Sequence, residues 1–169
     1  MFGRWRGLRV GRDHATGWSR QESAGGDDPE RRLRLLIESE DGAEVVAIRN
    51  LLDRHGYDVS WCPGPDARRS SRCPLVRKGT CRLVDEADAV LCTLDLDNAK
   101  HRAVVEALNT LHPEKPVIVA ASPALSRRWA RLLTARATLR RRPQPRELVT
   151  TIDDALVGVA DPAPPAPDR

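Results

Sequence analysis

The sequence predicts an α/β domain built on a doubly wound, five-stranded parallel sheet. Short apolar runs alternate along the chain with segments whose apolar residues have helical spacing, and turn residues separate the two kinds of segment. Parallel strands need a crossover connection, so strands that alternate with helices form βαβ units. Hydrophobic residues make up 40% of the chain but aromatic residues only 4%. The core is therefore expected to be aliphatic.

The first part of this pattern contains two strands and one helix. An apolar run over residues 33–37 is typical of a strand, and the acidic run 38–41 ends it. Apolar residues at helical spacing follow over 43–55. Gly56 then stands where a left-handed residue commonly ends a helix. Residues 57–62 have strand character and run into a Pro-Gly-Pro turn.

The second part supplies three further strands. Residues 87–94 are nearly all apolar, as expected of a central strand that is buried on both faces. The remaining predicted elements are a helix over 99–111, a strand over 116–121, a basic helix over 123–134, a weak strand over 137–141 and a last helix over 145–157.

The two ends of the chain are not expected to join this domain, which spans residues 31–158. Residues 1–30 lack an apolar period and are predicted to be a disordered arm. The Pro-rich residues 159–169 are predicted to be a disordered tail. No run approaches the roughly 18 apolar residues of a membrane span, and no apolar stretch follows the basic start as a secretory signal requires. We therefore expect a cytoplasmic protein.

Several segments carry a more specific pattern. They are LLIESE at 35–40, HGYDV at 55–59, DAVLCTL at 88–94, PVIV at 116–119 and RPQPREL at 142–148. Together they resemble the receiver domain of bacterial response regulators, the signal-transduction modules of two-component systems. The resemblance covers residues 32–157 and implies a receiver/flavodoxin-like fold.

The resemblance also implies where a phosphorylation site would lie. In receivers an acidic pair holds Mg²⁺, an Asp after the third strand accepts the phosphoryl group, and a hydroxyl and a Lys stabilise its charge. An ungapped alignment puts Glu38 and Ser39 at the pair, Thr93 at the acceptor, Ala121 at the hydroxyl and Arg142 at the lysine. A threonine hydroxyl cannot form the acyl phosphate. We therefore expect a degenerate site, a pseudo-receiver that acts by protein–protein interaction, and no enzyme.

A shifted alignment is the alternative. Asp95 lies two residues beyond Thr93, so a small shift places it at the acceptor position. Glu38, Glu40 and Asp95 would then form an oxygen-rich pocket for Mg²⁺. The ungapped match of the helix over 99–111 favours Thr93.

Four cysteines form the second candidate site, a loop between the second and third strands with its flanks. Their spacing is C-x10-C-x7-C-x10-C, without the short separations of a zinc knuckle. Cys92 is expected to be a small core residue. For Cys62, Cys73 and Cys81 three alternatives stay open: unlinked thiols, a Cys73–Cys81 disulfide, or a metal site for Zn²⁺. Neighbouring basic residues are expected to lower the thiol pKa values. A thiol- or metal-dependent sensor is thus the alternative function, whereas the leading expectation includes no cofactor.

A basic cluster is the candidate partner surface. It consists of Arg127, Arg128, Trp129 and Arg131. The resemblance places residues 124–142 on the face through which receivers bind partners, so a protein partner or a homodimer is expected there. A nucleic acid is a weaker alternative, because a net charge of +4 permits it without requiring it, and a solvated helix face is the simplest interpretation.

Neither the histidines nor the short motifs of the sequence predict a catalytic site. His101 and His112 are expected to bound an exposed helix and to have no partner. His55 is expected to be packed or to cap the first helix. The sequence has no Gly-rich phosphate loop, no G-x-S-x-G and no H-E-x-x-H. A small flavodoxin-like enzyme is therefore the least favoured alternative.

Overall fold

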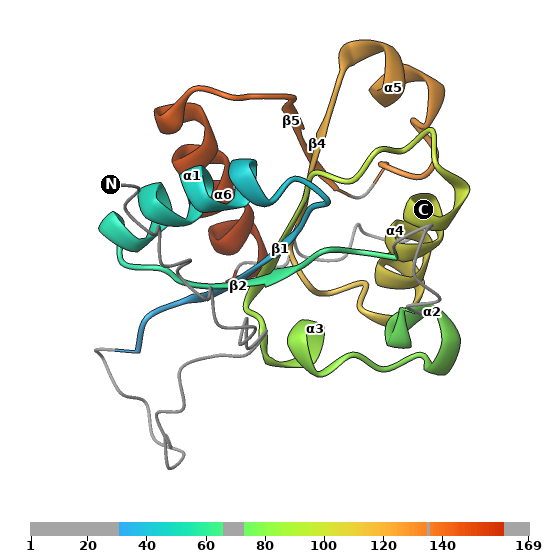
Figure 1. Cartoon of the computed structure of the whole chain (residues 1–169), viewed down its shortest axis with the longest axis horizontal. Helices are drawn as coiled ribbons and strands as arrows, with labels where there is room; N and C mark the ends of the chain where they lie inside the picture. The colour runs from blue at the N-terminus through green and yellow to red at the C-terminus, as the bar shows by residue number, and fades with distance from the viewer. Residues whose placement is uncertain (1–30, 66–72, 135, 161–169) are drawn as a thin grey trace, which may run out of the picture.

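The computed structural model describes residues 31–65, 73–134 and 136–160. Five parallel strands form one sheet in the order β2-β1-β3-β4-β5, which confirms the predicted fold class (Figure 1). The strands are β1 (Arg34–Glu38), β2 (Asp58–Cys62), β3 (Ala89–Cys92), β4 (Val117–Ala121) and β5 (Ala137–Arg140). The helices are α1 (Gly42–Arg54), α2 (Pro74–Lys78), α3 (Arg82–Glu86), α4 (Ala99–Leu111), α5 (Pro123–Arg128) and α6 (Pro145–Ala160).

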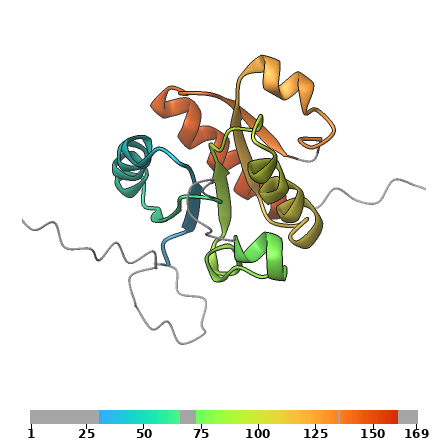
Figure 2. The same cartoon turned by 45° about the vertical axis from the view of Figure 1, so that its right-hand side comes forward.

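Helices cover both faces of the sheet. Helices α1 and α6 lie on one face and α2, α3 and α4 on the other, as Figures 1 and 2 both show. Successive residues of a strand point to opposite faces. Leu35 and Ile37 accordingly pack on the α1–α6 side, and Leu36 packs on the α4 side. Strands β3 and β4 are buried along their whole length, as parallel central strands should be.

Two predicted segments differ from the structure. The loop between β2 and β3 contains the short helices α2 and α3, which cover the sheet with Leu75 and Val84. The basic helix predicted over 123–134 ends at Arg128, where α5 passes into turns. The backbone of Trp129 leaves the helical region there, and Trp129 and Leu132 pack against the core on the α4 side.

The predicted domain limits fall close to the ends of the sheet and its helices. Helix α6 extends through residue 160, so the tail predicted from residue 159 begins inside a helix. The arm over 1–30 and the remaining tail over 161–169 lie outside the described residues. Within the described ranges, no helix combines the length and the apolar character that a membrane span requires.

Candidate functional site at the carboxyl edge of the sheet

The carboxyl ends of β1 and β3 meet at the point where the strand order reverses direction. Open α/β sheets bind their ligands at this place. A cavity of about 670 Å³ opens there. Its walls include the predicted site residues Ser39, Glu40, Thr93, Asp95 and Arg142, together with Asp41, Glu44 and Arg141. Ala121 ends β4 and is buried in the core on the α4 side instead.

Glu44 is the residue of this site that sequence reasoning missed. Its Oε2 accepts hydrogen bonds from the Thr93 hydroxyl at 3.0 Å and from the Ser39 hydroxyl at 3.2 Å. Both hydroxyl residues are buried, with 1% exposure for Ser39 and 5% for Thr93. One carboxylate from the first turn of α1 thus accepts from both hydroxyls, which the ungapped alignment places at the metal-ligand and acceptor positions. Hydrogen bonds to an ionised acceptor are stronger than those between neutral groups.

The start of α1 explains how Glu44 reaches the site. Asp41 is the N-cap of the helix, and its side chain accepts hydrogen bonds from the backbone N–H groups of Ala43 and Glu44. An acidic cap followed three residues later by Glu is close to a capping box. Here the Glu44 side chain bonds Ser39 and Thr93 in place of the cap backbone. The Asp-x-x-Glu spacing was the signal available in the sequence.

Backbone pairing fixes the register of the acceptor position. Cys92 pairs with Glu38, and the N–H of Thr93 donates to the Glu38 carbonyl at 2.9 Å. Asp95 lies farther along, in the loop that leads to α4. Its carboxylate accepts from the Asp97 N–H at 3.0 Å, which is a contact within the loop.

Glu38 lies in the sheet and is directed away from the cavity. Cys62 and Cys92 pair with it on the neighbouring strands, so the three side chains form a row on the face covered by α2, α3 and α4. Glu38 is only 2% exposed, and its Oε2 has no hydrogen-bond partner in the part of the chain that the structure describes. Burial raises the pKa of Glu38 to about 7, against a smaller lowering by the hydrogen bond with the Cys62 thiol.

The oxygen-rich pocket of the shifted alignment is therefore not formed. Glu40 and Asp95 line the cavity, whereas the Glu38 carboxyl group is buried among thiols. In residues 31–65, 73–134 and 136–160, no three His, Cys, Asp or Glu side chains are placed to hold a metal ion. The described residues thus do not fit the Mg²⁺ that the receiver resemblance implies.

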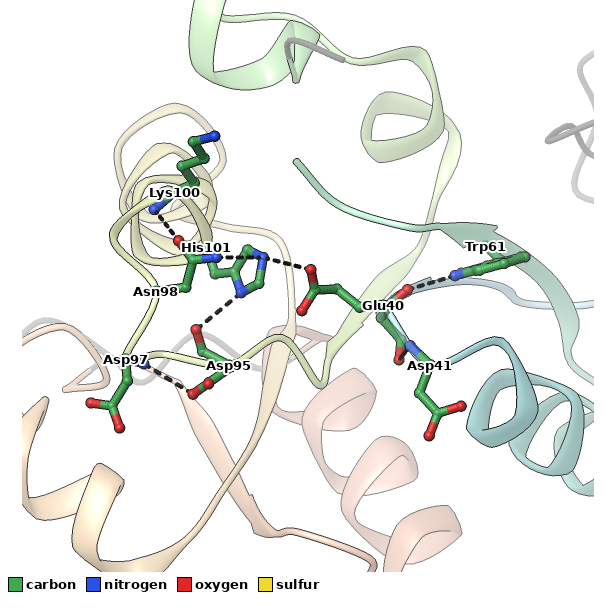
Figure 3. A network of polar contacts seen from close by, with 9 residues as sticks. Glu40, Asp41, Trp61, Asp95, Asp97, Asn98, Lys100 and His101 are labelled. Carbon is green, nitrogen blue, oxygen red and sulfur yellow. Dashed lines mark hydrogen bonds and ion pairs between the residues drawn. The ribbon is translucent and has the colours of Figure 1, made fainter. Parts of the chain in front are cut away.

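His101 connects the two loops that border the cavity (Figure 3). Its Nδ1 lies 3.0 Å from the Asp95 carbonyl oxygen and its Nε2 lies 3.3 Å from Glu40 Oε1. A carbonyl oxygen only accepts, so Nδ1 donates to Asp95, and Nε2 lies between the Glu40 carboxylate and the Asn98 amide, 3.3 Å from each. The histidine ties the end of β1 to the loop after β3.

The prediction of an exposed His101 without a partner is wrong. The side chain is 1% exposed and lies on the buried stripe of α4 with Val104, Val105 and Leu108. That spacing of three, four and seven residues was already visible in the sequence.

His112 and His55 differ in part from the prediction. His112 Nε2 lies 3.8 Å from an Asp85 carboxylate oxygen, so it too has a neighbour. His55 is the C-cap residue of α1 but is exposed, so the capping alternative holds and the packed one does not.

All four cysteines are free thiols. Burial raises the pKa values of Cys62, Cys73 and Cys92, to about 12 for Cys92, and the charge of Glu38 adds to the shift at each of them. The predicted lowering of the thiol pKa values is therefore wrong for these three residues. Their spatial neighbours are a carboxyl group and other thiols, although arginines are their neighbours in the sequence.

Thiol alkylation tests this correction. We expect iodoacetamide to modify Cys62 in the folded protein at least about tenfold more slowly at neutral pH than in the urea-unfolded protein, because each unit of raised pKa removes tenfold of thiolate, and Cys73 should also react more slowly. Mass spectrometry of quenched time points measures both rates. A folded-state rate equal to the unfolded one would identify reactive thiols and restore the sensor alternative.

The predicted partner surface is divided by the fold. Arg128 and Trp129 turn towards α4: Arg128 Nη1 lies 3.1 Å from Asp97 Oδ1, and the Arg102 guanidinium lies over the Trp129 ring at 4.2 Å. Arg142, in contrast, lines the carboxyl-edge cavity and has a positive φ of 56°. The residues predicted to form one face therefore belong to two places.

Comparison with known proteins supports the architecture. No family model and no curated protein matches the sequence. A CheY-like receiver domain protein from Methanospirillum hungatei is 18% identical, with a TM-score of 0.58 over 77% of this chain and 98% of that one. A putative pilus assembly protein from Burkholderia thailandensis is 23% identical, with a TM-score of 0.58 over 74% and 98%. This chain has a receiver fold. The chemotaxis protein CheY4 from Vibrio cholerae has the same fold, at 15% identity and a TM-score of 0.54 over 74% of this chain and 99% of that one.

The receiver fold confirms the resemblance found in the sequence at the level of structure. The carboxyl-edge cavity includes Thr93, which follows β3 directly. The carboxylate that accepts from Ser39 and Thr93 is that of Glu44, in the first turn of α1.

Proposed function

We propose that this chain is a regulatory module of the receiver fold that is not phosphorylated on aspartate and that acts through contacts with other proteins. The observation that carries the proposal is the pair of hydrogen bonds from Ser39 and Thr93 to Glu44. An acyl phosphate requires a carboxylate nucleophile. Thr93 offers a hydroxyl, and that hydroxyl is already used as a donor.

The same contacts favour a module with one resting arrangement over a ligand-driven switch. Glu44 joins α1 to the loops after β1 and β3, and His101 joins those loops a second time through Glu40 and the Asp95 carbonyl. A ligand shifts a conformational equilibrium only by its difference in affinity between two states. The hydroxyls of Ser39 and Thr93 already donate to Glu44, so they offer a phosphoryl group little to bind.

An NMR titration tests the proposal. The reduced protein receives Mg²⁺ and then beryllofluoride, a phosphoryl mimic, while its amide resonances are followed. We expect no shift clustered at Glu38, Glu40, Thr93 or Asp95, while a receiver with an intact acceptor aspartate responds in parallel.

The variant Asp95→Asn is the internal control. If the unaltered chain responds and Asp95→Asn does not, Asp95 is the acceptor and the proposal fails. A response that survives in Asp95→Asn would mean that beryllofluoride binds at another residue. It would also contradict the proposal, which expects no response at this site.

A further inference from the structure

A second cavity lies away from the carboxyl edge, between α4 and the end of α5. It has a volume of about 600 Å³. Its walls include Glu106 on α4. They also include Arg127 and Arg128 at the end of α5, and Trp129, Arg131 and Leu132 in the turns that follow. The three arginines are exposed, whereas Trp129 and Leu132 are half-buried. We call these residues the Arg–Trp cleft.

The cleft has a rigid aromatic floor. The guanidinium carbon of Arg102 lies 4.2 Å from the centre of the Trp129 ring, and that of Arg128 lies 5.6 Å from it. Arg102 is itself held by hydrogen bonds to the carbonyl oxygens of Leu96 and Asp97, at 2.7 and 2.9 Å. Cation–π contacts of this kind add about 0.5–1 kcal/mol each at exposed positions. Trp129 is therefore fixed in position before any ligand arrives.

The cleft already binds one carboxylate of its own chain. Arg128 Nη1 lies 3.1 Å from Asp97 Oδ1, and both side chains are more than half exposed. This pair shows the geometry in which a guanidinium beside Trp129 receives an acidic group. Arg127 and Arg131 flank the same cavity. The indole N–H of Trp129 is buried and has no acceptor among the described residues.

We propose that the Arg–Trp cleft binds an acidic peptide segment of a partner protein. Carboxylates of the segment would pair with Arg127 and Arg131, and an apolar side chain would pack on Leu132 beside the Trp129 ring, whose face Arg102 occupies. This inference rests on the proposed function, in that the chain works by contact, and it names the chemistry of the partner. It does not involve the carboxyl-edge cavity.

A peptide fits this surface better than a nucleic acid does. Binding of single strands uses aromatic faces on which bases stack, and here guanidinium groups already lie over the Trp129 ring. A polyanion also follows a continuous basic track. The cleft is interrupted by the carboxylates of Glu106 and Asp97, which a segment with alternating acidic and apolar residues avoids more easily than a regular phosphate backbone.

Fluorescence anisotropy with a defined probe tests the inference. The probe is a short fluorescein-labelled peptide of repeated Asp-Glu-Leu triplets, and a peptide with Asn and Gln in place of the acids is its neutral counterpart. We expect the double variant Arg127→Ala/Arg131→Ala to weaken binding of the acidic peptide roughly tenfold, the equivalent of about two surface ion pairs. The neutral peptide should bind more weakly to the unaltered chain.

A matched variant separates the cleft from net charge. Arg54→Ala/Arg146→Ala removes the same number of charges from exposed positions on α1 and α6, and it should change the affinity by less than about twofold. Equal losses in the two double variants, or no binding by the unaltered chain, would overturn the inference.

Two further results keep the proposals distinct. Tighter binding of an oligo(dT) strand than of the peptide would also overturn the inference and identify a nucleic-acid surface. The beryllofluoride titration reports on the carboxyl-edge cavity, which shares no lining residue with the Arg–Trp cleft. Failure of the peptide to bind therefore leaves the phosphorylation result unchanged, and a response to beryllofluoride leaves the peptide result unchanged.

Discussion

Replacing Glu38 with Gln should stabilise the protein by about 3 kcal/mol above pH 7 and change its stability little below pH 4.5. In the folded protein, burial raises the pKa of Glu38 from 4.5 to about 7. Between these two pH values the folded chain binds more protons than the unfolded chain, so stability falls as the pH rises. Each unit of pKa difference corresponds to about 1.4 kcal/mol. The penalty is complete once Glu38 is ionised, and Gln never incurs it.

Urea unfolding of the reduced protein at pH 5 and pH 8 measures this effect. The control is Asp154→Asn on α6, an exposed position where the same chemical change should have no comparable pH dependence. Loss of stability in Glu38→Gln at pH 8 would contradict the prediction. Such a loss would mean that the ionised carboxylate of Glu38 has a favourable partner in the folded protein.

The order of the elements could be predicted from the sequence because it depends on local periodicity. Apolar runs and helical stripes identify β1, α1 and α4 almost to the residue, and they place β3 within a predicted strand twice its length. The end of α5 could not be predicted in the same way. The basic residues after Arg128 have ordinary helix propensity, and only the packing of Trp129 against the α4 side explains why the helix stops.

The candidate site was less predictable because its contacts join distant parts of the chain. Thr93 and Glu44 are 49 residues apart, yet they share a hydrogen bond. A substitution of the acceptor is visible in a sequence, but a carboxylate supplied from another element is not. The prediction of lowered thiol pKa values failed for the same reason. Cys62 pairs with Glu38 across the sheet and not with the arginines near Cys73.

The buried position of His101 is an intermediate case. Its place on the stripe of α4 predicts burial, because residues three and four apart share a helix face. Its bonds to Asp95 and Glu40 require knowledge of where the β1 and β3 loops end. A buried histidine at a helix start is therefore a useful signal that two loops meet, although the sequence alone does not say which.

Replacing Arg136 with Met should destabilise the protein by about 3 kcal/mol, although Arg136 looks like one more residue of the basic cluster. Its guanidinium donates to the Asn109 side chain at 2.6 Å and to the carbonyl oxygens of Lys115 and Leu108 at 2.7 and 3.2 Å. The Leu108 carbonyl also accepts from the N–H of His112, so the loss of Arg136 falls on the other two acceptors. Removal of the charged donor leaves the part-buried Asn109 oxygen and Lys115 carbonyl without it, at about 1–3 kcal/mol each.

The comparison of three variants by urea unfolding decides whether this contact network matters. Arg131→Met, at an exposed position, should leave stability nearly unchanged, and Arg136→Lys should recover only a small part of the loss because one ammonium group cannot reach all the acceptors. Equal stability of Arg136→Met and the unaltered chain would show that water replaces the guanidinium. A large loss of stability would show that Arg136 anchors the end of α4. This helix carries both His101, which contacts Asp95 at the carboxyl edge, and Arg102, which lies over Trp129, so its position affects both proposed surfaces.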